Sequence, residues 1–261
     1  MLTIAFLWNI YKMTKDQPDW KLPPGVDRGL WDYLHSSEMV ESYDAMMADS
    51  TLAETDVRFC EEQFPTPGRL IDLGCGTGRL ALHFAKKGFD CVGVDLSEVM
   101  LKRARENATA MPTPTGSLAY RIGNLTSLME YPTDHFDDAA CLFSTLGIIR
   151  GDENRWLALS EFFRILKPGG RLVLHVHNRY FTSGLGWKGW ISGDVTMPQA
   201  YGGAALTLHH FGLGHVKRLL RAVGFRVRRV VPLTPNGRLP HSWWLPTVRA
   251  YGYLFAVDKP L

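Results

Sequence analysis

Short apolar runs alternate with amphipathic segments from residue 68 onward, and this alternation is the main structural signal in the chain. The apolar runs lie at 69–73, 91–94, 119–122, 139–143 and 171–177, and helical segments lie between them at 79–87, 97–108 and 154–166. Nearly continuous apolar strands that alternate with helices are typical of a parallel sheet covered by helices on both faces.

The pattern is different at the beginning of the chain. We expect residues 1–26 to be an extended or disordered lead-in, because the part that follows Met13 is polar and contains several prolines. Residues 27–64 are predicted to form a helical cap, in which the last helix is capped by Ser50 or Thr51 and stops before Pro65.

Residues 65–261 are predicted to form one α/β domain with two irregular insertions, at 179–208 and at 234–247. The regular pattern resumes between them with a helix that Gly224 terminates and a strand at 225–233, and a last strand follows at 250–257. Long irregular insertions in a compact domain are usually functional loops, so we expect both to form the acceptor site.

Composition and charge narrow the class of protein. The chain has 261 residues, 46% of them hydrophobic and 21% charged, which suits a globular domain with a sizeable core. Its 29 basic and 26 acidic residues give a net charge of only +3, so nucleic acid is not an expected partner. The four cysteines form no C-x-x-C pair, which favours reduced thiols in a cytoplasmic protein over disulfides or a zinc site.

No apolar run reaches the roughly 18 residues that a membrane-spanning helix needs. The first ten residues are apolar, but they lack the preceding basic residue and the cleavage site of a signal peptide. We interpret them as a frayed tail, or as residues upstream of a start at Met13.

A glycine-rich turn follows the first apolar strand. Gly74, Gly76 and Gly78 form a G-x-G-x-G pattern directly before a helix, where backbone N–H groups can face a ligand. A dinucleotide fingerprint would place the third glycine at position 79, which is Arg79 here. Asp72 precedes the turn, and its carboxylate would repel a pyrophosphate but favour an ammonium group, so a nicotinamide-dependent oxidoreductase is the weaker alternative.

The second strand ends in Asp95, which lies 17 residues after Gly78 (95 − 78). A carboxylate at this position can accept hydrogen bonds from both hydroxyls of a ribose. The alternative interpretation is a local helix-capping role beside Ser97.

These segments together resemble the class I S-adenosylmethionine-dependent methyltransferases. Residues 71–78 and 92–97 resemble the first two motifs of that family, and Gly123-Asn124-Leu125, 136–147 and 164–172 match later segments in order. The resemblance implies a doubly wound, seven-stranded, mostly parallel Rossmann-like sheet with a reversed last strand and a helical N-terminal cap. It also implies S-adenosylmethionine as the cofactor.

The resemblance implies a role for each matching position. Gly74, Cys75, Gly76 and Gly78 would pass beneath the methionine part of the cofactor, with Asp72 near its ammonium group and backbone groups of Phe143 and Ser144 at its amino acid end. Asp95 would bind the ribose, Leu96 and Leu125 would enclose the adenine, Asn124 would face the adenine amine in place of the family's usual Asp, and Tyr43 would cover the cofactor.

Methyl transfer is an in-line displacement, so alignment of the reactants supplies much of the rate and a general base is optional. His177 ends the fifth strand and is the candidate base, although a histidine at a strand end is more often structural. His175 lies two residues earlier and on the same face. Displacement at a sulfonium requires no metal ion, and we expect none.

The insertions contain Trp187, Trp190, Trp243 and Trp244, which either form the walls of an acceptor site or simply anchor the loops to the sheet. We therefore predict methyl transfer to an oxygen or nitrogen atom of a small, apolar or aromatic molecule. The alternative from another class is a non-catalytic S-adenosylmethionine-binding or scaffold protein. The sequence does not predict an oligomeric state.

Overall fold

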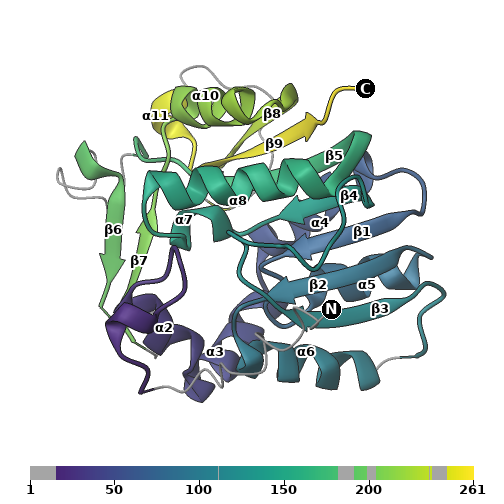
Figure 1. Cartoon of the computed structure of the whole chain (residues 1–261), viewed down its shortest axis with the longest axis horizontal. Helices are drawn as coiled ribbons and strands as arrows, with labels where there is room; N and C mark the ends of the chain where they lie inside the picture. The colour runs from purple at the N-terminus through teal and green to yellow at the C-terminus, as the bar shows by residue number, and fades with distance from the viewer. Residues whose placement is uncertain (1–15, 111, 182–190, 199–203, 235, 237–245) are drawn as a thin grey trace, which may run out of the picture.

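The computed structural model describes residues 16–110, 112–181, 191–198, 204–234, 236 and 246–261 (Figure 1). Its centre is a seven-stranded sheet with the strand order β3-β2-β1-β4-β5-β9-β8. These strands are β1 (Arg69–Leu73), β2 (Asp90–Asp95), β3 (Leu118–Ile122), β4 (Phe136–Cys141), β5 (Leu166–His177), β8 (Arg226–Leu233) and β9 (Gly252–Asp258). The pairs among the first five strands are parallel, and β9 runs antiparallel to both β5 and β8. The predicted mostly parallel sheet with a reversed last strand is confirmed.

Helices cover both faces of this sheet, because each helix presents one apolar side to it. The helices are α2 (Arg28–Leu34), α3 (Ser37–Ala48), α4 (Thr51–Gln63), α5 (Arg79–Lys86), α6 (Glu98–Thr109), α7 (Thr145–Ile148), α8 (Asp152–Ile165), α10 (Leu213–Val223) and α11 (Pro246–Arg249). Apolar residues of α8 and α10 belong to one buried cluster, and those of α4, α5 and α6 belong to a second cluster. Polar caps begin several helices as expected, with Ser50 accepting from Ala53 N–H and Ser97 from Met100 N–H.

The segment before α2 differs from the expected extended or disordered lead-in over residues 16–26. It contains a short 3-10 helix, η1 (Asp19–Lys21), and it is bonded to the rest of the molecule. The carbonyl of Gly25 accepts a hydrogen bond of 2.8 Å from Arg150 N–H, and that of Pro24 accepts one of 3.0 Å from the Asn124 amide. The partners lie 100 or more residues away in sequence, so local polarity could not predict them.

The first insertion contains a strand pair that sequence periodicity did not predict. β6 (Asp194–Met197) and β7 (Leu206–His209) form a separate two-stranded antiparallel sheet, which Figure 1 shows extending from the main sheet towards α2. Both strands are only four residues long, too short to give a clear alternation. All four tryptophans of the insertions lie outside the described residues, as does most of 234–247.

The structure locates the cysteines and several of the basic residues near the C-terminus. The four cysteines are buried and free. Arg226 and Arg228 pair with Asp258, and Arg229 pairs with Glu62, so these basic residues near the C-terminus are partnered on the protein surface. Among the residues that the structure describes, no helix is both long and apolar enough to cross a membrane.

Asp138 in β4 gives a pH-dependent contribution to stability. Burial raises its pKa from an ordinary value of 3.8 to about 7, although the Arg171 charge lowers it. The folded state therefore holds a proton that the unfolded chain has already released, and the free energy of unfolding falls as pH rises from about 4 to about 7. We expect Asp138→Asn to remove this dependence and to gain up to a few kcal/mol relative to the parent between pH 5 and 8, as measured by urea unfolding.

The adjacent Asp137→Asn is the control, because the pKa of Asp137 is shifted in the opposite direction. Burial raises that pKa, but the Lys167 side chain and the Arg69 N–H together lower it below its usual value. Its stabilising contribution is therefore present at neutral pH and is lost in acid. Parallel pH profiles of parent and Asp138→Asn would contradict the assignment.

Candidate active site

The glycine turn after β1 adopts a backbone shape that only glycine accepts easily. Gly74, Gly76 and Gly78 all have positive φ, at 80°, 52° and 82°. A Cβ at Gly74 would lie 2.3 Å from Thr145 Cγ2, and one at Gly78 would lie 2.2 Å from the Tyr120 hydroxyl. The turn therefore packs tightly against its neighbours at two glycines and remains open at Gly76, which faces the cavity.

Asp95 connects this turn to the tip of β2. Its Oδ2 accepts a hydrogen bond of 2.8 Å from Gly76 N–H, and its Oδ1 accepts one of 2.9 Å from Ser97 N–H. Burial raises the pKa of Asp95 above its ordinary value, and the backbone N–H groups offset part of that shift. A carboxylate has about four lone-pair positions, so both oxygens can still accept from a ligand. The structure thus shows the local bond to Ser97 together with a pocket-facing carboxylate.

A cavity lies at the carboxyl ends of the five parallel strands, where open α/β sheets bind ligands. One wall consists of the glycine turn and the residues that follow β2, β3 and β4. The opposite walls come from the N-terminal segment with α2, and from α7 with β6 and β7. The lining residues are Pro24, Gly25, Val26, Leu30, Tyr33, Leu34, Tyr43, Gly74, Gly76, Asp95, Leu96, Met100, Gly123, Asn124, Leu125, Phe143, Thr145, Ile148, Ile149, His177, Met197, Leu206 and Leu208.

The structure brings most of the predicted site residues to this cavity. Those that line it are Tyr43, Gly74, Gly76, Asp95, Leu96, Asn124, Leu125, Phe143 and His177. Asp72, Cys75, Gly78 and Ser144 do not line it, and all four support the wall from behind. Asp72 is buried, its pKa is raised to about 7 by burial, and it accepts a hydrogen bond from Ala81 N–H.

The chain turns sharply between β4 and α7. Phe143 and Ser144 have φ values of 52° and 61°, in the left-handed region that costs a non-glycine residue energy. Ser144 is bonded twice to β5, because its N–H donates to the His175 carbonyl and its Oγ accepts from His177 N–H, both at 3.2 Å. This strained turn therefore fixes the Phe143 side of the cavity to the strand that carries His177.

Asn124 makes contacts that the sequence did not predict. Its amide donates to the Pro24 carbonyl, and its oxygen accepts a hydrogen bond of 3.1 Å from Thr126 N–H. One lone pair of that oxygen remains for the expected contact with an adenine amine. Asn124 therefore also joins the loop after β3 to the N-terminal segment.

His177 is buried at the base of the cavity. Its ring contacts those of His175, His210 and Tyr251, with centroid distances of 5.5, 5.2 and 4.8 Å. Burial, together with the charges of His175 and His210 when they are protonated, lowers the pKa of His177 well below 6.5. This shift favours the neutral form of the ring at pH 7.

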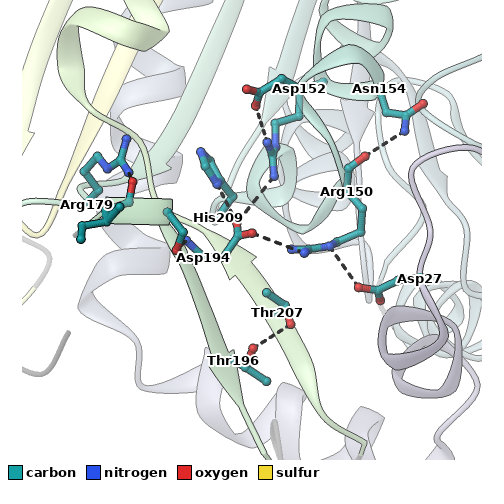
Figure 2. A network of polar contacts seen from close by, with 12 residues as sticks. Asp27, Arg150, Asp152, Asn154, Arg179, Asp194, Thr196, Thr207 and His209 are labelled. Atoms are coloured by element: carbon teal, nitrogen blue, oxygen red, sulfur yellow. Dashed lines mark hydrogen bonds and ion pairs between the residues drawn. The ribbon is translucent and has the colours of Figure 1, made fainter. Parts of the chain in front are cut away.

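An ion-pair network holds the cavity walls together, and sequence analysis missed it (Figure 2). Arg150 lies just before α8, and its guanidinium is 3.0 Å from Asp27 Oδ2, at the start of α2, and 3.4 Å from Asp194 Oδ2 in β6. Asp194 also accepts a hydrogen bond of 2.7 Å from His209 Nδ1. Burial alone would raise the pKa of Asp194, but the His209 bond and the Arg150 charge lower it. Arg150 is at least 44 residues from Asp27 and Asp194 in the sequence, so spacing gives no signal for these pairs.

The residues present fit S-adenosylmethionine. Asp95 offers acceptor positions for ribose hydroxyls, Leu96 and Leu125 offer apolar surface for adenine, and the open face of Gly76 lets a ligand approach the main chain closely. Within the described ranges, no group of three or more His, Cys, Asp or Glu side chains is arranged to hold a metal ion.

Comparison with known proteins gives independent support for a methyltransferase domain in this chain. A family model described as a methyltransferase domain matches residues 71–174. The chain is 31% identical to a dTDP-3-amino-3,4,6-trideoxy-alpha-D-glucopyranose N,N-dimethyltransferase of Streptomyces venezuelae over 132 residues, 50% of each chain. It is 28% identical to the S-adenosyl-L-methionine-dependent Diels-Alderase iliD of Neonectria sp. (strain DH2) over 182 residues, 69% of this chain and 67% of that one.

A solved S-adenosylmethionine-dependent methyltransferase of Methanosarcina mazei has the same fold. Its TM-score is 0.64 at 23% identity, with 78% of this chain and 97% of that one aligned. The chain spans about half the length of the first curated relatives that it matches.

The ribose contact can be tested at Asp95. We expect Asp95→Ala to weaken binding of S-adenosylhomocysteine by about 1.5–3 kcal/mol, because hydrogen bonds to a charged group are lost. Isothermal titration calorimetry measures this, with Asp90→Ala, at the opposite end of β2 and bonded to Ser117, as the control. Unchanged affinity in a folded Asp95→Ala protein would show that the ribose assignment is wrong.

The ion-pair network can be tested at Arg150. In Arg150→Met, the N-terminal segment loses its charged link to β6, and exposed or half-exposed pairs contribute up to about 1 kcal/mol. We expect faster amide hydrogen exchange in residues 25–30 and roughly twofold to fivefold weaker binding of S-adenosylhomocysteine.

The matched control is Arg105→Met, which removes a surface pair with Glu98 on α6. Equal exchange rates for residues 25–30 in parent and Arg150→Met would contradict the proposed link.

Proposed function

We propose that this chain, whose residues 71–174 form a class I S-adenosylmethionine-dependent methyltransferase domain, transfers a methyl group to an oxygen or nitrogen atom of a small apolar molecule. S-adenosylmethionine is the cofactor of this family and supplies an activated methyl group. The observation that supports the proposal is that one cavity is lined by the predicted cofactor-binding residues Asp95, Leu96 and Leu125, by an apolar wall and by His177.

Three groups of residues would hold the cofactor. Asp95 would accept hydrogen bonds from the ribose, and Leu96 and Leu125 would lie on either side of the adenine. Gly74 and Gly76 would pass beneath the methionine part. Tyr43 would cover it, since a Cβ at Gly76 would lie 3.6 Å from the Tyr43 ring. Asp72, Cys75, Gly78 and Ser144 would act through the wall that they support, not by direct contact.

The remaining wall indicates an apolar acceptor. It consists mainly of aliphatic and methionine side chains from the N-terminal segment, α2, α7 and the β6–β7 pair: Val26, Leu30, Leu34, Ile148, Met197, Leu206 and Leu208. Tyr33 and His177 line the same cavity, and the ring of His177 would orient one polar atom of the acceptor. Such a site favours a molecule with a large apolar surface and a single nucleophilic atom.

His177 would take the proton that the acceptor atom loses. The neutral ring would accept the proton from the hydroxyl or amine as the new bond to carbon forms, and would later release it to solvent. The apolar walls would exclude water, so that the acceptor is the nucleophile that meets the methyl group. Alignment of the acceptor by these walls would supply the larger part of the rate.

A second function shares the same cavity. The relative iliD is named as an S-adenosyl-L-methionine-dependent Diels-Alderase, and the apolar wall would equally suit a substrate that cyclises without accepting a methyl group. A protein of this kind, or a binding protein without catalytic activity, would bind S-adenosylmethionine and release no S-adenosylhomocysteine. Mass spectrometry of reactions with a panel of apolar phenols, alcohols and amines separates these functions from methyl transfer.

His177 gives the mechanistic test. We expect His177→Asn to lower kcat by roughly 100-fold or more for an acceptor found in this panel, because the proton acceptor is lost. The affinity for S-adenosylhomocysteine should change less than threefold. Tyr33→Phe is the control for a polar residue that lines the cavity without taking the proton. A kcat for His177→Asn within threefold of the parent would contradict the base assignment.

A further inference from the structure

Asp56 is a buried carboxylate outside the cavity wall. It lies on α4 with 0% of its side chain exposed, and its Oδ2 is 3.0 Å from Nδ1 of His175, which is also fully buried. Its other oxygen, Oδ1, has no hydrogen-bond partner among the described residues. The nearby residues Phe59 and Cys60 of α4 belong to an apolar cluster. A buried carboxylate–histidine pair in such surroundings stabilises a fold less than apolar side chains of similar volume would, so stability alone does not favour it.

The pair is connected to the cavity through His177. Alternation along β5 places His175 and His177 on the same face, and their rings meet edge to face at a centroid distance of 5.5 Å. Asp56, His175 and His177 therefore form a continuous line from the N-terminal cap to the cavity. The titratable groups that face His177 are His175 on β5, His210 after β7 and Tyr251 before β9.

The hydrogen bond from Nδ1 determines the state of the His175 ring. Because a carboxylate only accepts hydrogen bonds, Nδ1 must carry the proton, and Nε2 of a neutral ring is then an acceptor. Among the residues described, neither Nε2 of His175 nor Nε2 of His177 has a hydrogen-bond partner. A proton taken up by His177 would place a positive charge beside two other imidazoles, and Asp56 is the carboxylate bonded to this cluster.

We infer that Asp56 and His175 are positioning residues for His177. Asp56 fixes the orientation and tautomer of His175, and the fixed ring holds His177 in one orientation at the cavity. The carboxylate also supplies a negative charge behind His177 when that ring takes a proton from the acceptor. The proton remains on His177 until it leaves to solvent. The inference rests on the proposed role of His177 as the base.

The test compares Asp56→Asn with Glu61→Gln in the full-length chain. Glu61 lies on the same helix and bonds another histidine, His83, at 2.8 Å on the surface, so it is a matched carboxylate–histidine control. Two-bond ¹H–¹⁵N spectra of ¹⁵N-histidine-labelled protein with S-adenosylhomocysteine report each tautomer. We expect a single Nδ1–H form of His175 in the parent, and shifted or doubled His177 signals in Asp56→Asn only. With an acceptor from the panel, kcat should fall about tenfold or more at unchanged KM.

The outcomes separate the two proposals. Unchanged His177 signals in a folded Asp56→Asn protein, or an Nε2–H form of His175 in the parent, would overturn the positioning role whatever the turnover. A parent protein that binds S-adenosylhomocysteine but forms none with any acceptor would contradict the proposed methyl transfer, and it would leave the spectroscopic result in place. If Asp56→Asn does not fold, His175→Gln removes the ring while keeping a hydrogen-bond donor for Asp56, and the same shift of His177 is expected.

Discussion

The hydrogen bond from Gly76 N–H to Asp95 Oδ2 is the contact on which the site depends. It joins the turn after β1 to the tip of β2, and both segments must be in place before a ligand can meet the carboxylate. The backbone reaches this position because Gly74 and Gly78 turn with positive φ against Thr145 and Tyr120. A side chain at Gly74 would clash with Thr145 and one at Gly78 with Tyr120, so this backbone shape determines both the packing around the turn and the shape of the cavity wall.

The other walls depend on segments that are distant in sequence. Arg150 links the start of α2 to β6, and Asn124 bonds the Pro24 carbonyl, so the cavity is enclosed by segments that lie far apart in the sequence. The strained turn at Phe143 and Ser144 is bonded to β5 beside His177. Cofactor wall, acceptor wall and candidate base are thus parts of one connected structure, in which a change at one wall is transmitted through a few polar contacts.

The sequence predicted the features that depend on local periodicity and on a short motif. Strands such as 69–73 and the glycine turn were located correctly, because apolar alternation and glycine spacing are local signals. It did not predict β6 and β7, which are too short to show a period, or the η1 segment, whose bonds go to residues far along the chain. It also did not predict the Asp56–His175 pair, because the two residues lie 119 positions apart in the sequence. Residue pairs that only the fold brings together can be identified from the structure but not from local sequence patterns.

The most direct test of this account is calorimetric titration of the purified protein with S-adenosylmethionine, S-adenosylhomocysteine and NADH in parallel. The account predicts micromolar binding of the first two ligands and no heat from NADH, because Asp95 and the glycine turn would hold the adenosine and methionine parts, whereas Arg79 stands where a dinucleotide fingerprint has its third glycine. Binding of NADH alone, or the absence of binding by both S-adenosyl compounds, would contradict it.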